Sequence, residues 1–82
     1  MEKSNTMYEE IFLKMYRSVD WMMQNYKSGD LKRNHVNYGS ATAFASVLQS
    51  MGHEIDLRVY GDGDYLLTNS IIVDGKQFDF FH

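Results

Sequence analysis

The sequence contains no cysteine and no proline. Without cysteine the chain has no disulfide bond, no thiol nucleophile, no iron–sulfur cluster and no thiolate zinc site. Chains of this kind are typical of a reducing compartment, and we expect the protein in the cytoplasm. Without proline, no residue has the fixed φ angle that interrupts helices and strands, so we expect mostly continuous elements.

Long apolar runs are absent as well. No run approaches the roughly 18 residues that cross a membrane, and the first residues are polar, without the apolar segment of a signal peptide. The net charge of −3 shows neither the basic surplus of a nucleic-acid-binding protein nor the strong acidity of a DNA mimic. We therefore expect neither a membrane nor a nucleic acid as partner.

The composition is that of a small folded domain. Of its 82 residues, 44% are hydrophobic and 15% are aromatic, which is too apolar for a disordered chain. A chain of this length forms one domain, spanning residues 1–82. Such a domain buries about 60–65% of its unfolded surface, so we expect a small core and modest stability.

The first part of the chain has the pattern of an amphipathic helix. The capping box Thr6-Met7-Tyr8-Glu9 predicts that the helix begins at Thr6. Gly29 suits the left-handed position that follows the last turn of a helix. Six apolar residues recur at spacings of three and four and form one stripe, which we expect in the core: Tyr8, Phe12, Met15, Val19, Met22 and Tyr26.

The opposite side of this helix carries a second feature. At roughly 100° per residue, Trp21 projects away from the stripe together with Glu10, Lys14 and Arg17, and Leu13 lies nearby. Trp and Arg are favoured at binding hot spots. We therefore predict a partner-binding surface formed by Leu13, Lys14, Arg17 and Trp21. The alternative is a helix covered on both sides, with Trp21 simply packed.

A polar stretch follows at residues 30–37, and we expect it to be a connecting loop. It contains a short basic cluster of Lys32, Arg33 and His35. Such a cluster is usually a solvated part of a loop. Contact with an anion or an acidic partner is the alternative.

A second helix is predicted up to Met51, capped at its start by Asn37 or Ser40. Gly52 ends this helix in the same way as Gly29 ends the first one. The helix is rich in small residues, which allow another element to approach its backbone closely. Its bulky residues are Phe44, Val47, Leu48 and Met51.

After the second helix, apolar and polar residues alternate, which is typical of half-buried antiparallel strands. We predict strands over residues 54–60, 65–73 and 76–81. The first two are joined by a turn at residues 61–64. The last two are joined by Asp74-Gly75, a strong signal for a two-residue hairpin turn of type I′.

This hairpin turn fixes the register of the last two strands. It pairs Val73 with Lys76, Ile71 with Phe78, and Asn69 with Phe80. One sheet face should then meet the helices: Leu67, Ile71, Val73, Phe78 and Phe80. The other face should be solvated: Thr68, Ser70, Ile72, Gln77 and Asp79. The predicted fold class is α+β, with two N-terminal helices packed on a three-stranded antiparallel sheet in the order α-α-β-β-β.

No metal or cofactor motif is complete. Asp62-Gly63-Asp64 is similar to a fragment of a calcium loop, but the twelfth residue from Asp62 is Val73, where a bidentate Glu is needed. No metal-ligand spacing is present among the histidines, which are His35, His53 and His82. We therefore expect neither a metal nor a cofactor.

Residues 37–82 combine three features: the segment Asn37-Tyr38-Gly39-Ser40, a small-residue helix ending at Gly52, and the hairpin within residues 68–79. This layout resembles the minimal core of the papain and transglutaminase-like cysteine hydrolases. In that family a Cys begins the helix, a His lies on the strand before the hairpin turn, and an Asp or Asn on the next strand orients the His. The resemblance covers a little over half of the chain.

The residues that carry the chemistry of that family are replaced in this chain. The nucleophile position falls near Asn37 or Tyr38, and the histidine position falls within Thr68, Asn69 and Ser70, none of which is a histidine. Asp79 alone has a counterpart, and the predicted register places it opposite Ser70. Loss of both nucleophile and base removes the mechanism. The resemblance therefore implies a degenerate scaffold, a pseudoenzyme, with Tyr38, Asn69 and Asp79 at the former active-site positions.

We therefore expect a non-catalytic protein-binding module and not an enzyme. Small domains without catalytic motifs commonly act by occupying the surface of another protein. Phages and mobile elements encode many inhibitors of this size, which act on host proteins. This step rests on analogy between protein classes. The expected partner is a host or cellular protein.

Two alternatives remain open. The first is a small hydrolase with a Ser or Asp centre, which needs a polar cleft near Tyr38, Ser40, Asn69 and Asp79. Within it His35 and Ser40 could pair as base and nucleophile, although no third residue orients them. The second alternative is a homodimer, formed through an unpaired sheet edge or through the apolar back of the first helix.

Overall fold

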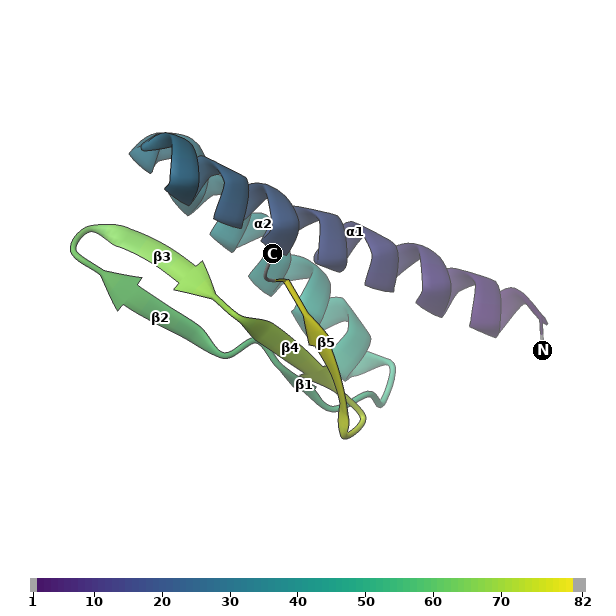
Figure 1. Cartoon of the computed structure of the whole chain (residues 1–82). Helices are drawn as coiled ribbons and strands as arrows, with labels where there is room; N and C mark the ends of the chain where they lie inside the picture. The colour runs from purple at the N-terminus through teal and green to yellow at the C-terminus, as the bar shows by residue number, and fades with distance from the viewer. Residues whose placement is uncertain (1, 81–82) are drawn as a thin grey trace.

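The computed structural model describes the backbone of residues 2–80 and the side chains of residues 6–80 (Figure 1). Its helices are α1 (Glu2–Ser28) and α2 (Leu31–Ser50). Its strands are β1 (Ile55–Asp56), β2 (Val59–Asp62), β3 (Tyr65–Thr68), β4 (Ser70–Val73) and β5 (Lys76–Asp79). The fold class is α+β, as predicted. Neither described helix has the length and apolarity that a membrane crossing requires.

Helix α1 begins at Glu2, four residues earlier than predicted. The capping-box prediction at Thr6 is wrong, because a cap residue must be non-helical and the backbone that precedes Thr6 is already helical. The predicted end is confirmed. The helix ends at Ser28, and Gly29 follows with φ of +79°. Residues with a Cβ atom rarely adopt this backbone conformation.

The predicted stripe of α1 is the centre of the core. Met15, Val19 and Met22 are fully buried, and Tyr8, Phe12 and Tyr26 pack partly buried around the same cluster. Aromatic rings of α1 also contact the end of the chain, with ring centroids 5.0 Å apart between Phe12 and Phe78 of β5 and 4.4 Å apart between Tyr16 and Phe80, which follows β5. The apolar periodicity therefore located the buried face of this helix.

Helix α2 begins at Leu31, so the predicted loop over residues 30–37 is wrong, and neither Asn37 nor Ser40 is the cap. Asp30 is the cap, since its Oδ1 accepts a hydrogen bond from the Arg33 N–H at 3.0 Å. Lys32, Arg33 and His35 of this stretch lie on the exposed side of the helix, whereas Asn34 is buried. The C-terminal end agrees with the prediction, because Gly52 follows Met51 with φ of +100°.

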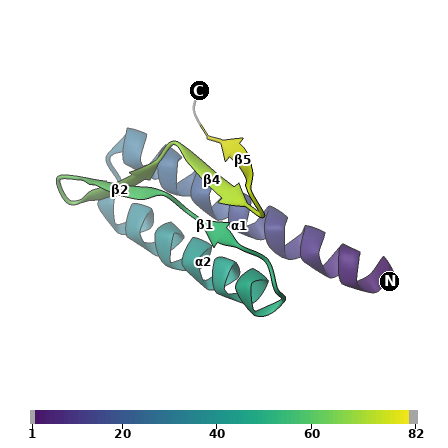
Figure 2. The ribbon, with the colours of Figure 1, turned by 90° about the horizontal axis from the view of Figure 1, so that it is seen from below.

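The two helices lie side by side and pack against each other along most of the length of α2 (Figures 1 and 2). Small residues make this close approach possible, since Ala41 and Ala45 are buried with Leu48 in the shared core. The strands cover one side of the helix pair, which gives the two layers that were predicted (Figure 2).

The strands form two sheets where the sequence predicts one. One sheet has the order β1-β4-β5, and the other is the hairpin β2-β3. The predicted register is confirmed, with Val73 opposite Lys76 and Ile71 opposite Phe78. The Phe80 N–H also donates to the Asn69 carbonyl at 2.9 Å. The last strand is shorter than predicted, since β5 ends at Asp79 and Phe80 lies outside it, while Phe81 falls outside the described residues.

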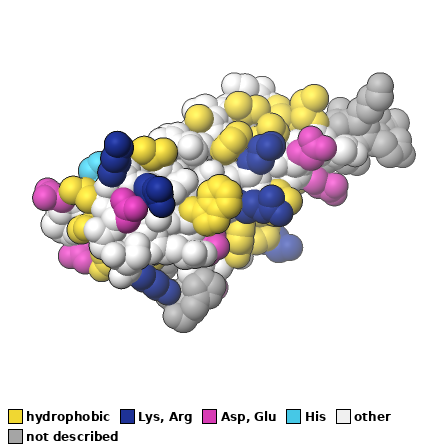
Figure 3. Space-filling model, turned by 90° about the horizontal axis from the view of Figure 1, so that it is seen from above, with side chains coloured by type: hydrophobic (Ala, Val, Ile, Leu, Met, Phe, Trp, Pro, Cys, Tyr) yellow, Lys and Arg dark blue, Asp and Glu magenta, His cyan; other side chains and the backbone are white. Residues whose placement is uncertain are grey.

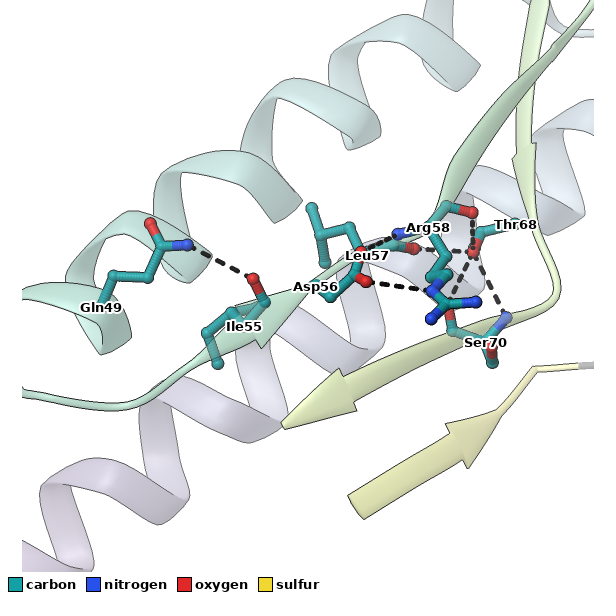
Figure 4. Close-up of polar contacts among 7 residues, drawn as sticks. All are labelled: Gln49, Ile55, Asp56, Leu57, Arg58, Thr68 and Ser70. Carbon is teal, nitrogen blue, oxygen red and sulfur yellow. Dashed lines mark hydrogen bonds and ion pairs between the residues drawn. The ribbon is translucent and has the colours of Figure 1, made fainter. Parts of the chain in front are cut away.

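The division into two sheets occurs where the predicted strands break. Arg58 has φ of +54°, which interrupts the strand predicted over residues 54–60, and Asn69 separates β3 from β4. At this break the Thr68 hydroxyl lies 2.8–2.9 Å from the carbonyl oxygens of Leu57, Arg58 and Ser70 (Figure 4). Thr68 and Ser70 are buried, so the prediction that they face solvent is wrong.

The turn predicted at Asp74-Gly75 is confirmed. Asp74 has φ of +52° and Gly75 has φ of +83°, as a type I′ turn requires. The preceding turn is shorter than predicted. Asp62 pairs with Tyr65, so Gly63-Asp64 alone forms the tip of the β2–β3 hairpin.

Candidate protein-binding surface

A groove of about 200 Å³ lies between the two helices on the side opposite the core stripe of α1. We call it the Trp21 groove, and it is lined by Lys14, Arg17, Ser18 and Trp21 from α1 and by Phe44 from α2. Three of the four residues predicted for the binding surface therefore share one groove. Leu13, the fourth, is exposed on α1 but does not line it.

Trp21 is half-exposed, with 52% of its surface accessible, so the alternative that it is packed inside a covered helix is wrong. Two residues that line the groove with Trp21 are nevertheless covered by the fold, at least in part. Ser18, one turn earlier on α1, is buried, and Phe44 is partly buried. Trp21 thus combines a large accessible surface with a fixed apolar neighbour.

Phe44 is the residue of this groove that the sequence did not indicate. Phe44 is one of the bulky residues of the second helix, far in sequence from the residues of the predicted surface. Helix–helix packing brings it beside α1, because residues four apart on α2, such as Ala41 and Ala45, face the core and turn Phe44 toward the seam.

The lining of the groove is positively charged. It holds the side chains of Lys14 and Arg17, and no carboxylate of the described residues lines it. The ion pairs found within residues 6–80 lie elsewhere, between Asp30 and Arg33, Asp56 and Arg58, and His53 and Asp74. Figure 3 shows hydrophobic side chains along a helical face of the molecule, with Lys and Arg side chains beside them. The groove therefore presents aromatic surface next to two cations without acidic partners.

A second groove, of about 290 Å³, lies between α2 and β1. Small and polar residues line it together with two aliphatic ones: Thr42, Ala45, Ser46, Gln49, Asp56, Ile55 and Leu57. The Gln49 side chain donates to the Ile55 carbonyl at 3.4 Å across it, and the Asp56 carboxylate accepts from Arg58 at 3.0 Å (Figure 4). Neither described histidine, His35 or His53, lines this groove, so the imidazole base of a hydrolase centre is missing from the described lining.

The basic cluster that was predicted to lie in a loop helps to hold the β2–β3 hairpin against the helices. The His35 Nε2 atom lies 2.6 Å from the Asp64 carbonyl, and the Tyr65 hydroxyl donates to the Gly29 carbonyl at 2.6 Å. Tyr26 donates to the Asp62 carboxylate, and this hydrogen bond raises the pKa of Tyr26. His35 of the predicted basic cluster is therefore engaged with the fold.

His53 and Asp74 form an ionisable pair that also contacts neighbouring residues. The His53 Nδ1 atom lies 2.7 Å from Asp74 Oδ2, while Asp74 Oδ1 accepts from the Glu54 N–H at 2.8 Å. The Glu54 N–H and then His53 lower the pKa of Asp74. The Tyr8 ring packs on the His53 ring with centroids 4.3 Å apart, and burial raises the pKa of Tyr8.

This pair orients an imidazole, as in a catalytic triad, but it lacks a nucleophile. Among the described residues, no Ser or Thr hydroxyl is hydrogen-bonded to His53. The His53–Asp74 pair and the Tyr8 ring lie where the first turns of α1, the end of α2 and the β4–β5 turn meet. We therefore assign the His53–Asp74 pair a structural role. No group of three or more potential His, Cys, Asp or Glu metal ligands occurs in the part of the chain that the structure describes.

The former active-site positions implied by the hydrolase resemblance are distributed over three elements. Tyr38 lies inside α2 and not at its start, because α2 begins at Leu31. Asn69 is exposed at the β3–β4 junction, and Asp79 on β5 lies opposite Ser70, as predicted. None of Tyr38, Asn69 and Asp79 lines either groove. The resemblance stays a hypothesis.

Comparison of the chain with protein-family models, with curated proteins and with solved structures gives no match in any of the three.

Proposed function

We propose that the protein is a small non-catalytic protein-binding module that binds its partner through the Trp21 groove. The observation that supports this is the lining itself, in which a half-exposed Trp21 lies beside Phe44 and two cations without acidic partners among the described residues. Large exposed apolar side chains on a small domain favour association. Tryptophan and arginine are also the residues that most often dominate binding energy at protein interfaces.

The same lining gives little support for catalysis. Among the described residues of the Trp21 groove, Ser18 alone carries a hydroxyl, and neither a histidine nor a carboxylate lies there to activate it. Lys14 and Arg17 bind anions readily, but hydrolysis also needs a nucleophile and a base in contact. Binding through shape and charge is the function that this geometry favours.

The proposed mode of action is occupation of a surface on a host or cellular protein, as an inhibitor would do. A domain of 82 residues with an apolar groove can block a site on a larger protein without chemistry of its own. The energy of such an interface is concentrated in few anchor residues. We propose Trp21 as the anchor, with Lys14 and Arg17 as charged contacts beside it.

The test uses capture from an extract of the native host by the wild-type protein, by Trp21→Ala and by Leu13→Ala, followed by mass spectrometry. Leu13 is the matched control, since it is exposed on the same helix but lies outside the groove. We expect a partner that is retained by Leu13→Ala and lost with Trp21→Ala. Loss of an anchor weakens binding by about 2 kcal/mol or more.

Tryptophan fluorescence provides an independent readout, because Trp21 is the single tryptophan of the chain. Its emission in the free protein should be red-shifted and readily quenched by acrylamide, and it should become protected in the complex. Equal capture by wild type and Trp21→Ala would overturn the proposal. A monodisperse dimer of the free protein with protected Trp21 would assign the groove to self-association instead.

A further inference from the structure

The Trp21 groove follows the seam between two helices, and this restricts the backbone conformation of its occupant. The residues of the lining all lie inside α1 or α2, where backbone N–H and C=O groups bond within the helix. The seam therefore offers no backbone partners to an extended peptide, which depends on them for pairing. A helix satisfies its own backbone and can dock through side chains alone.

Further apolar side chains are exposed on both helices outside the groove. Val47, one turn after Phe44 on α2, is exposed, and so is Met7, two turns before Lys14 on α1. From Met7 to Trp21 the helix rises roughly 20 Å. This is the length of a helical segment of about four turns, so a third helix of that length could span the distance from Met7 to Trp21.

The charge of the lining selects among helical occupants. Lys14 and Arg17 border the aromatic pair, and no carboxylate of the described lining balances them. A second copy that docked symmetrically through this groove would bring the same two cations against each other. An acidic segment would instead place carboxylates beside these two cations.

We propose that the occupant of the Trp21 groove is an acidic amphipathic helix of a partner protein. One aliphatic or aromatic side chain of this helix inserts between Trp21 and Phe44, and Asp or Glu residues about one turn away contact Lys14 and Arg17. The proposal rests on the proposed function and specifies the chemistry of the partner.

The test is a selection from a displayed library of helix-forming peptides of about 16 residues, long enough to populate a helix in isolation. Each peptide has alanine fixed at some positions, and all other positions are varied. No peptide contains tryptophan. Peptides are selected on the wild-type protein and counter-selected on Trp21→Ala. We expect enrichment of sequences with an aliphatic or aromatic anchor flanked by Asp or Glu at helical spacing.

The outcomes separate the two proposals. If the enriched peptides depend on Trp21 but are neutral or basic, the acidic-helix inference is overturned and the proposed function stands. If no peptide distinguishes wild type from Trp21→Ala, both fall. If the enriched peptides depend on Trp21 but are proline-rich or β-branched without helical spacing, the helical part of the inference is overturned.

Charge reversal provides the quantitative check on a selected acidic peptide. Lys14→Glu and Arg17→Glu should each weaken its affinity about two- to fivefold, as is typical of an exposed charge pair. Lys32→Glu makes the same change in net charge on an exposed residue of α2 outside the groove, and it should leave the affinity nearly unchanged. Equal effects of all three variants would indicate general charge attraction and overturn the assigned contacts.

Discussion

The side-chain amide of Asn34 on α2 pairs with the backbone of Leu66 on β3 as a neighbouring strand would. Its Nδ2 atom donates to the Leu66 carbonyl at 2.7 Å, and its Oδ1 atom accepts from the Leu66 N–H at 2.8 Å. The same Nδ2 atom donates to the Met22 carbonyl at 2.9 Å. One buried side chain therefore joins both helices to the β2–β3 hairpin and satisfies the outer edge of β3.

Replacement of Asn34 should accordingly be costly. Asn34→Ala leaves the N–H and C=O groups of Leu66 without these partners, and we expect a loss of about 2–4 kcal/mol in the free energy of unfolding. Asn69→Ala, on an exposed side chain, is the control and should change it by less than about 0.5 kcal/mol. Urea unfolding measures both, and equal values would contradict the structural assignment of Asn34.

The two sides of α1 should respond differently to the same truncation. Met15 is fully buried, so Met15→Ala should lower the free energy of unfolding by about 2–5 kcal/mol through lost burial and a residual cavity. Leu13→Ala removes a side chain that is 45% exposed and should cost far less. Thermal melts that show Met15→Ala to be neutral would mean that the stripe is not core.

Two glycine substitutions should change the stability of the protein in opposite directions. Gly75 has φ of +83° in the type I′ turn, so Gly75→Val should destabilise the protein by about 1–2 kcal/mol. Gly39 lies inside α2 and faces open space where a Cβ would project, so Gly39→Ala should stabilise it by about 0.5–1 kcal/mol. Denaturant midpoints compare the pair. A stable Gly75→Val variant would show that the turn does not need positive φ.

The Asp74 carboxylate should make stability fall in acid. Its pKa in the folded protein is lowered below the ordinary value of 3.8, by the Glu54 N–H first and by His53 second. The folded state therefore favours the ionised form. The resulting stabilisation is complete above the ordinary pKa and is lost as the pH falls through the lowered pKa of the folded state.

Asp74→Asn tests this dependence, because asparagine also tolerates the positive φ of the turn. We expect urea midpoints measured between neutral pH and about pH 2 to fall less steeply with acid in this variant than in wild type. Asp64→Asn, at the tip of the other hairpin, is the control and should retain the wild-type slope. Identical slopes for wild type and Asp74→Asn would refute the assignment.

The purified protein should hydrolyse neither esters nor amides above the rate in buffer. The reason is that Ser40 and Asp79, the residues left for a hydrolase centre, line neither groove, and the described histidines bond elsewhere. A chromogenic ester and a fluorogenic amide serve as substrates. Turnover by wild type that disappears in Ser40→Ala or Asp79→Asn would support the hydrolase alternative.

Local patterns predicted the parts of the fold that depend on neighbouring residues. The stripe from Tyr8 to Tyr26 followed from apolar spacing, because side-chain direction along a helix is fixed by the backbone period. The turn at Asp74-Gly75 and its register followed from backbone preference. The predicted start of α2 is wrong because Asp30, which caps the helix from its position before Leu31, lies in a polar stretch without apolar periodicity.

The lining of the Trp21 groove could be predicted from the sequence only in part. Trp21, Lys14 and Arg17 share one side of a single helix, so their proximity follows from the sequence. Phe44 joins them only because α2 packs against α1. Leu13 lies on the same side in projection, yet the groove forms along the seam with α2 and excludes it.

The sequence by itself determined the two helix ends at Gly29 and Gly52, the buried side of α1 and the last hairpin, since each depends on interactions within a few residues. The tertiary structure alone decided that Arg58 and Asn69 break the strands, that Thr68 is buried and that Phe44 completes the Trp21 groove. These outcomes depend on contacts between elements far apart in the chain, and no local pattern specifies which distant surface each residue will meet.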